Sequence, residues 1–137
     1  MIAVAECEDG LWLVDIGETA EEDELAGREP GAHVERPRPA ELAPAWVSSL
    51  LVDVDAVGSA VVVCVARRPP LLVSHDAGAT WTERGGGLPA GRAVALGPTP
   101  DDVLYAARNR LHLSRDGGVF WRALGVELPE IRDVAWG

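Results

Sequence analysis

The alternation of apolar and polar segments along this chain is typical of a protein made of short β-strands. Short apolar runs, rich in valine and leucine, alternate with polar segments that contain glycine, aspartate or proline. The clearest runs are residues 50–54, 60–66, 71–73, 92–96, 103–107 and 111–113. The pattern predicts an all-β fold.

One eight-residue motif occurs twice in the second half of the chain. Residues 74–81 read SHDAGATW and residues 114–121 read SRDGGVFW, so Asp76 and Asp116 are 40 residues apart. The strands around the two copies also match. Each repeat predicts three strands joined by turns, then an Asp/Gly turn, then a fourth strand that begins at the tryptophan. Four strands in about 40 residues is the size of one propeller blade.

A weaker third copy lies near the start of the chain, where Asp15, Gly17 and Thr19 keep part of the motif. Asp15 precedes Asp76 by 61 residues, which exceeds one repeat. The residues in excess of one repeat lie in the segment 19–44, which contains four consecutive acidic residues and four prolines. We expect an irregular surface insertion there, with a short helical turn near 21–26. An acidic arm that binds a partner is the alternative.

The repeated segments resemble the Asp-box, or BNR repeat, of sialidase-like propellers, sortilin-type receptors and photosystem II assembly factors. The resemblance covers residues 50–137 well and residues 1–20 weakly. It implies one domain, residues 1–137, of about three four-stranded antiparallel blades. It also implies that the box residues stabilise the fold at the outer lower edge and take no part in catalysis. These residues are Asp15, Gly17, Thr19, Ser74, Asp76, Gly78, Thr80, Trp81, Ser114, Asp116, Gly118 and Trp121.

The chemistry of these residues suits a tight turn. An aspartate carboxylate can accept several backbone N–H bonds that the turn would otherwise leave unpaired. Glycine allows the positive φ that such a turn needs. Serine and threonine hydroxyls can complete the network, and the tryptophans can pack between blades.

The two ends of the chain match different strands of the repeat. The first residues align with the second strand of a blade, and residues 132–137 align with the innermost strand, residues 92–97. Known propellers contain about 4–8 blades, so three blades need a partner. We therefore expect a six-bladed ring made by a homodimer, in which each chain lends its C-terminal strand to the other. A remnant of a longer propeller, or one half of a heteromeric ring, is the alternative.

The charge of the chain excludes some partners. The 137 residues include 22 acidic and 12 basic side chains, with a formal net charge of -10. This charge disfavours nucleic acid and anionic membrane surfaces as partners. The sequence contains neither a membrane-spanning apolar run nor a secretory signal. Cys7 and Cys64 alone cannot form a disulfide framework, and the expected location is cytoplasmic.

Arginines are the strongest candidates for ligand binding. Arg67, Arg68, Arg108 and Arg110 fall in the expected connections between the second and third strands of two blades. Such a cluster could hold a carboxylate or phosphate, although solvated or ion-paired side chains are the simpler interpretation. Trp46, which follows the proline-rich segment, is a candidate for stacking on a sugar.

No pattern in the sequence singles out a catalytic site. The resemblance to sialidases would imply an arginine triad, a tyrosine–glutamate pair and an aspartic acid, but Tyr105, the only tyrosine, falls within an expected strand. No spacing suits a metal site, and no cofactor is expected. The sequence thus favours a non-enzymatic binding or assembly module that mediates protein interaction. A lectin-like propeller that binds carbohydrate and a sialidase-like glycoside hydrolase are the alternatives.

Overall fold

The computed structural model describes residues 1–137 and has the all-β architecture that the sequence predicts. Its strands form three antiparallel sheets of four strands each. Three helices of the 3-10 type lie between strands, and they are η1 (Ala20–Glu22), η2 (Ala40–Leu42) and η3 (Ala45–Val47). None of the helices has the length and apolar character needed to span a membrane.

Each sheet has a simple strand order. The first sheet contains, in spatial order, β12 (Ile131–Trp136), β1 (Ile2–Cys7), β2 (Gly10–Asp15) and β3 (Glu24–Pro30). The second sheet contains β4 (Leu51–Val57), β5 (Ala60–Val65), β6 (Leu71–Ser74) and β7 (Thr82–Arg84). The third sheet contains β8 (Ala93–Leu96), β9 (Val103–Ala106), β10 (Arg110–Ser114) and β11 (Arg122–Glu127).

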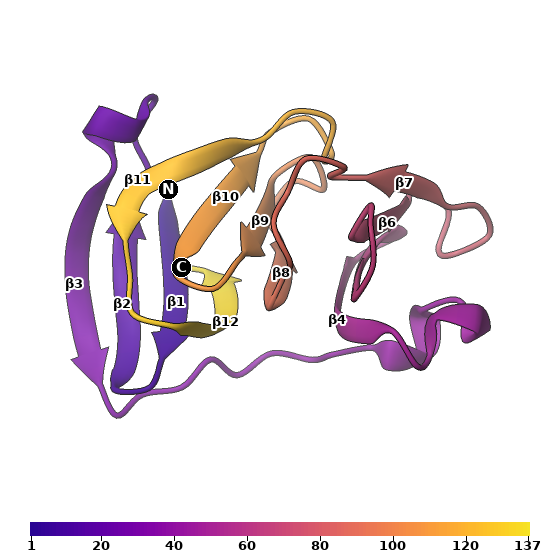
Figure 1. Ribbon diagram of the computed structural model, residues 1–137, viewed down its shortest axis with the longest axis horizontal. Coiled ribbons are helices and arrows are strands. Elements are labelled where there is room, and N and C mark those ends of the chain that lie inside the picture. Colours follow the sequence, from indigo (N-terminus) through magenta and orange to yellow (C-terminus); the bar gives the residue numbers. More distant parts are fainter.

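The third sheet lies between the other two. Figure 1 shows it in the middle of the molecule, and its strand β8 contacts both β12 and β4. One apolar cluster fills the space between the first and third sheets, and a second fills the space between the second and third. Because β9 contributes to both clusters, all four of its residues are buried. This burial explains why β9 reads as a continuous apolar run.

The structure of residues 24–30 differs from the irregular insertion that the sequence predicts. They form β3, the outer strand of the first sheet, although they fall within the insertion expected at residues 19–44. The segment ELAGREP has no β-branched residue and is largely exposed, so no local pattern marks it as a strand. Its pairing with β2 extends from Gly10 opposite Pro30 to Asp15 opposite Glu24. The irregular connection to the second sheet is therefore residues 31–50, which we call the linker.

The C-terminal strand completes the first sheet, but it does so within one chain, whereas the sequence predicts exchange of this strand between two chains. β12 pairs with β1 in an antiparallel register that places Ala3 opposite Trp136 and Ala5 opposite Val134. In the structure both strands belong to the same chain, so the sheet is complete without exchange between two chains. Ile131 and Val134 are fully buried in the cluster between the first and third sheets, which fixes the register of β12.

Two arginines of the linker connect the inner strands of the first and second sheets. Arg36 and Arg38 each form ion pairs with Asp53 of β4 and Asp133 of β12. Arg36 also donates to one backbone oxygen of β4 and one of β12, at 3.3 and 3.1 Å. The side chains of Asp53 and Asp133 are only 1% and 6% exposed. A buried charge network therefore links these two sheets through the linker.

Asp53, together with Asp55, also protects the free edge of β8. This strand pairs with β9 on one side only. On the other side, Asp53 and Asp55 accept hydrogen bonds from the N–H groups of Val94 and Leu96, at 2.9 and 2.7 Å. Unpaired edge N–H groups would otherwise be open to another strand.

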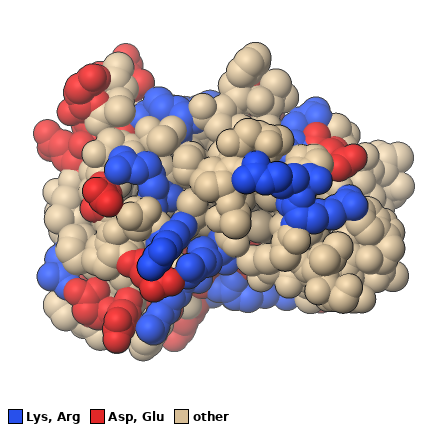
Figure 2. Space-filling model, viewed as in Figure 1, with Lys and Arg blue, Asp and Glu red and all other residues tan.

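Charged side chains are distributed unevenly over the face shown in Figure 2. Acidic side chains gather at the left, over β3 and the connection before it, whereas arginines lie across the middle. Glu21 and Glu22 lie on the connection before β3, and Glu24 is the first residue of β3. This acidic end of the molecule borders its largest hollow.

Candidate functional site

The turn at residues 74–81 is held by hydrogen bonds among its own residues. The carboxylate of Asp76 accepts the N–H of Thr80 at 2.8 Å, the Thr80 hydroxyl at 2.6 Å and the Ser74 hydroxyl at 2.7 Å. The Ser74 hydroxyl also accepts the N–H of Gly78 at 2.8 Å. Gly78 has a φ of 92°, which favours glycine. Trp81 at the end of the turn packs against the apolar cluster on the outer side of the second sheet.

These bonds lower the pKa of Asp76 to about 2, and the Thr80 hydroxyl makes the largest contribution. Because this pKa lies below the usual 3.8, the carboxylate stabilises the fold above pH 3.8, and that contribution is lost as the pH falls toward 2. We predict that Thr80→Val raises the pKa of Asp76 toward 3.8 in an NMR titration of its carboxyl carbon. Thr80→Ser keeps the hydroxyl and should leave the pKa low. An equal rise in both variants would contradict this assignment.

The turn at residues 114–121 has hydrogen bonds like those of the turn at 74–81, but different side chains face the solvent. Asp116 accepts the N–H groups of Val119 and Phe120, at 3.1 and 3.0 Å, and the Ser114 hydroxyl at 2.8 Å. The Ser114 hydroxyl accepts the N–H of Gly118 at 2.8 Å. Phe120 stands where the first turn has threonine, and its side chain does not fold back onto the turn. Phe120 is 77% exposed and Val119 is 53% exposed.

The N-terminal copy of the motif differs from the other two. Asp15 is 60% exposed, and its only ion pair is with the N-terminal ammonium at 4.0 Å. A different residue, Asp23, accepts the N–H of Gly17 at 2.9 Å and that of Gly125 at 2.9 Å. Asp23 also forms an ion pair with Arg122 at 2.6 Å. The expected role of Asp15 in the turn is thus taken by Asp23, which connects the first sheet to the third.

Asp23 is the residue that sequence reasoning missed. Burial by itself would raise the pKa of its carboxyl group, but the hydrogen bonds from Arg122, Gly125 and Gly17 outweigh burial and lower the pKa. Asp23 lies within an acidic run whose other members are exposed, so no local signal distinguishes it from its neighbours. Its partners Arg122 and Gly125 lie about 100 residues further along the chain.

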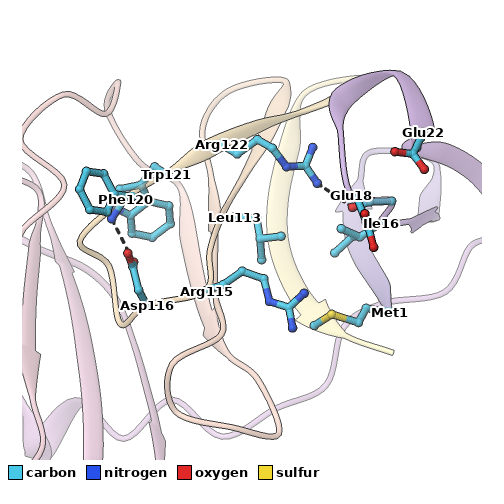
Figure 3. A pocket seen from close by; sticks show the side chains of 11 residues that line it. Met1, Ile16, Glu18, Glu22, Leu113, Arg115, Asp116, Phe120, Trp121 and Arg122 are labelled. Carbon is cyan, nitrogen blue, oxygen red and sulfur yellow. Dashed lines mark hydrogen bonds between the residues drawn. The ribbon is translucent and has the colours of Figure 1, made fainter.

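The largest hollow of the molecule has a volume of about 710 Å³ and lies between the first and third sheets. Figure 3 shows Phe120 and Trp121 at one end of it and the segment around Glu18 at the other. Residues from both sheets line it, namely Met1, Ile16, Gly17, Glu18, Glu22, Leu113, Arg115, Asp116, Phe120, Trp121 and Arg122. The hollow therefore combines apolar side chains with charged groups of both signs.

The charges around this hollow are not balanced. Arg115 pairs with Asp102 at 3.0 Å, and Arg122 pairs with Asp23, so both arginines are already neutralised. Glu18 has no cationic partner. Glu22 accepts only the Thr19 hydroxyl, at 3.1 Å. The free charge on this side of the hollow is therefore negative.

The structure brings together some of the arginine candidates and separates others. Arg67 stacks over the ring of Trp46, with 4.7 Å between its guanidinium carbon and the ring centroid. Arg67 and Arg68 both line a second hollow, of about 300 Å³, at the junction of the second and third sheets. Arg108 and Arg110 lie on the third sheet and do not line this hollow. The expected cluster thus divides into two parts.

Arg110 and Tyr105 are engaged within the fold. Arg110 donates to the backbone oxygen of Leu124 at 2.9 Å and lies 4.0 Å from Glu127. Tyr105 is fully buried, and its hydroxyl donates to the backbone oxygen of Pro89 at 2.5 Å. No group of three or more His, Cys, Asp or Glu side chains is placed to hold a metal ion.

Comparison of the chain with protein-family models, with curated proteins and with solved structures finds no match. The resemblance to Asp-box repeats therefore rests on the turns at 74–81 and 114–121 and on the spacing between them.

Proposed function

We propose that this chain is a non-enzymatic binding module built from three Asp-box propeller blades, and that its ligand is another protein. The observation that carries the proposal is the exposure of Phe120 and Val119 on the 114–121 turn, beside the 710 Å³ hollow. Leaving a phenylalanine side chain in water forgoes about 2 kcal/mol of burial. Exposed aromatic residues next to a hollow are typical anchors of protein interfaces.

The 114–121 turn also limits the entropy that binding would cost. The carboxylate of Asp116 holds the N–H groups of Val119 and Phe120, so the backbone that carries these side chains is already ordered. A preorganised anchor loses less conformational freedom when a partner binds. This ordering favours a role in recognition for the exposed pair.

The free carboxylates near the hollow indicate the chemistry of the partner. Glu18 and Glu22 line the hollow without cationic partners, and Glu21 and Glu24 are close to Glu22 along the chain. A partner segment with an apolar anchor flanked by lysine or arginine would complement this surface. The proposed ligand is therefore a basic peptide segment that inserts one apolar side chain beside Phe120.

Selection from a displayed peptide library should test this proposal. We expect the native chain to enrich peptides that carry an aromatic or aliphatic residue next to lysine or arginine. Phe120→Thr, which restores the residue type of the first turn, should weaken the binding of a selected peptide about tenfold or more in calorimetry.

Val57→Thr is the matched control, because Val57 is also an exposed apolar residue but lies on β4, away from the hollow. This variant should bind the selected peptide as the native chain does. Enrichment of acidic peptides, or equal binding by the native chain and Phe120→Thr, would refute the proposed surface.

Carbohydrate binding is the second candidate, and Trp46 is the observation that favours it. This side chain is 56% exposed, and aromatic rings of this kind can stack on sugars. A glycan array is the direct test, and Trp46→Ala should abolish any sugar binding found there. Sialidase-like hydrolysis has less support, because the buried Tyr105 hydroxyl is already bonded to the backbone.

The homodimer also stays a proposal. Exchange of β12 between two chains would use the register that β12 and β1 make within one chain, and it would build the expected six-bladed ring. Light scattering should then give twice the 14.5 kDa mass of the chain. We also propose a cytoplasmic location, since Cys7 and Cys64 are free thiols in different apolar clusters.

A further inference from the structure

The second hollow has a chemistry unlike that of the first. It measures about 300 Å³ and lies where the β5–β6 connection meets the β7–β8 connection. Val52, Val65 and Leu88 contribute apolar walls, while Arg67 and Arg68 contribute positive charge. Val65 and Leu88 are buried, so these walls belong to the packed part of the fold.

The two arginines of this hollow differ in what they can bind. Arg67 stacks on Trp46 and lies 3.9 Å from Glu83, so its charge is partly engaged. Arg68 forms neither an ion pair nor a side-chain hydrogen bond within the protein. In a chain of net charge -10, Arg68 is an exposed, unpaired cation at the mouth of a hollow. A guanidinium in this state can form two parallel bonds with a carboxylate or phosphate.

Two backbone N–H groups without acceptors also belong to residues that line the hollow. Ala90 and Gly91 line it, and their backbone N–H groups donate to no acceptor in the protein. The Tyr105 hydroxyl beneath Gly91 is already bonded to the backbone oxygen of Pro89. No carboxylate lines the hollow. Its lining therefore offers positive charge and N–H groups to a ligand, together with an apolar surface.

From this arrangement we infer that the second hollow binds a small carboxylate or phosphate ester with a compact apolar body. Arg68 holds the anionic group, and Val52, Val65 and Leu88 surround the apolar part. The volume fits a ligand of the size of a substituted benzene ring, at the lower end of the usual range for small-molecule sites. This site is separate from the surface around Phe120. An experiment that refutes one of the two proposed binding sites therefore leaves the other proposal unaffected.

An NMR titration with phenyl phosphate and benzoate should test this inference. We expect saturable shifts of the amide signals of residues 65–68 and 88–91. Benzamide has the same ring without the charge, and it should bind at least tenfold more weakly. Arg68→Gln should weaken the binding of phenyl phosphate at least tenfold, and Val52→Asp should do the same by placing a negative charge at the rim.

Arg108→Gln is the matched control, since Arg108 lies 40 residues after Arg68 in the equivalent connection and does not line the hollow. It should bind phenyl phosphate as the native chain does. The inference is overturned if no shift saturates, if benzamide binds as well as benzoate, or if Arg108→Gln and Arg68→Gln weaken binding equally. Amide spectra of each variant without ligand show whether its fold is intact.

Discussion

Replacing Arg36 with methionine should lower the free energy of unfolding by about 3–5 kcal/mol, the largest effect expected of any single substitution in this chain. Arg36 is 10% exposed and contacts both Asp53 and Asp133, which are almost fully buried. Its removal leaves two carboxylates with only Arg38, which is 43% exposed, as their remaining cation. Unfolding in urea, followed by tryptophan fluorescence, measures the loss.

The control for this prediction is Arg132→Met. Arg132 is exposed on β12, next to Asp133, and forms no ion pair. Its substitution should change the free energy of unfolding by no more than about 0.5 kcal/mol. Adding Asp133→Asn to Arg36→Met should recover part of the lost stability, because it removes one of the uncompensated charges. Equal losses in Arg36→Met and Arg132→Met would show that the buried network does not hold the sheets together.

Asp23→Ala should cost about 3 kcal/mol of unfolding free energy, because it removes the carboxylate to which three groups donate, and only Arg122 keeps another acceptor, the backbone oxygen of Gly17. These donors are the N–H groups of Gly17 and Gly125 and the guanidinium of Arg122. The close packing of this junction prevents easy relaxation, since a Cβ on Gly125 would lie 1.9 Å from the backbone oxygen of Ala20. Urea unfolding and amide hydrogen exchange at Gly17 and Gly125 should both report the loss.

Asp15→Ala provides the comparison. Asp15 is the aspartate that the sequence motif selects, but it is 60% exposed, with one distant ionic contact. Its substitution should change the stability by about 0.5 kcal/mol or less. If Asp15→Ala is the more destabilising of the two variants, then Asp23 does not carry the structural role that its contacts indicate.

The two hollows differ in their chemistry. The hollow between the first and third sheets has the exposed Phe120 and unpaired glutamates. The hollow lined by the second sheet and the β7–β8 connection has apolar walls and the unpaired Arg68. A basic peptide and a small anion would therefore bind at separate places, and the variants Phe120→Thr and Arg68→Gln should not affect each other's ligand.

Local features of the sequence were enough to predict most strands. Every apolar run from residue 50 onward became a strand of the second or third sheet, because valine-rich segments buried on both faces favour extended backbone. The hydrogen bonds of the 74–81 and 114–121 turns join residues two to four positions apart. Interactions of such short range can be read from the order of residues alone.

Features that depend on contacts between residues far apart in the chain could not be predicted from the local sequence. β3 has no strand-forming residues of its own and depends on its ladder with β2. Arg36 and Asp133 are 97 residues apart, and Asp23 and Arg122 are 99 apart. The sequence identified Arg68 as a candidate, but only the packing of the β7–β8 connection against the second sheet placed a hollow beside it.

The sequence by itself determined most of the strands, the Asp/Gly turns and the match between the last strand and the first sheet, since each follows from local preference and repeat spacing. The tertiary structure decided which charges are buried, which arginine is free and where Phe120 and Val119 face solvent. The physical reason is that burial and ion pairing depend on distances between side chains far apart in the chain, which only the folded arrangement of the three sheets sets.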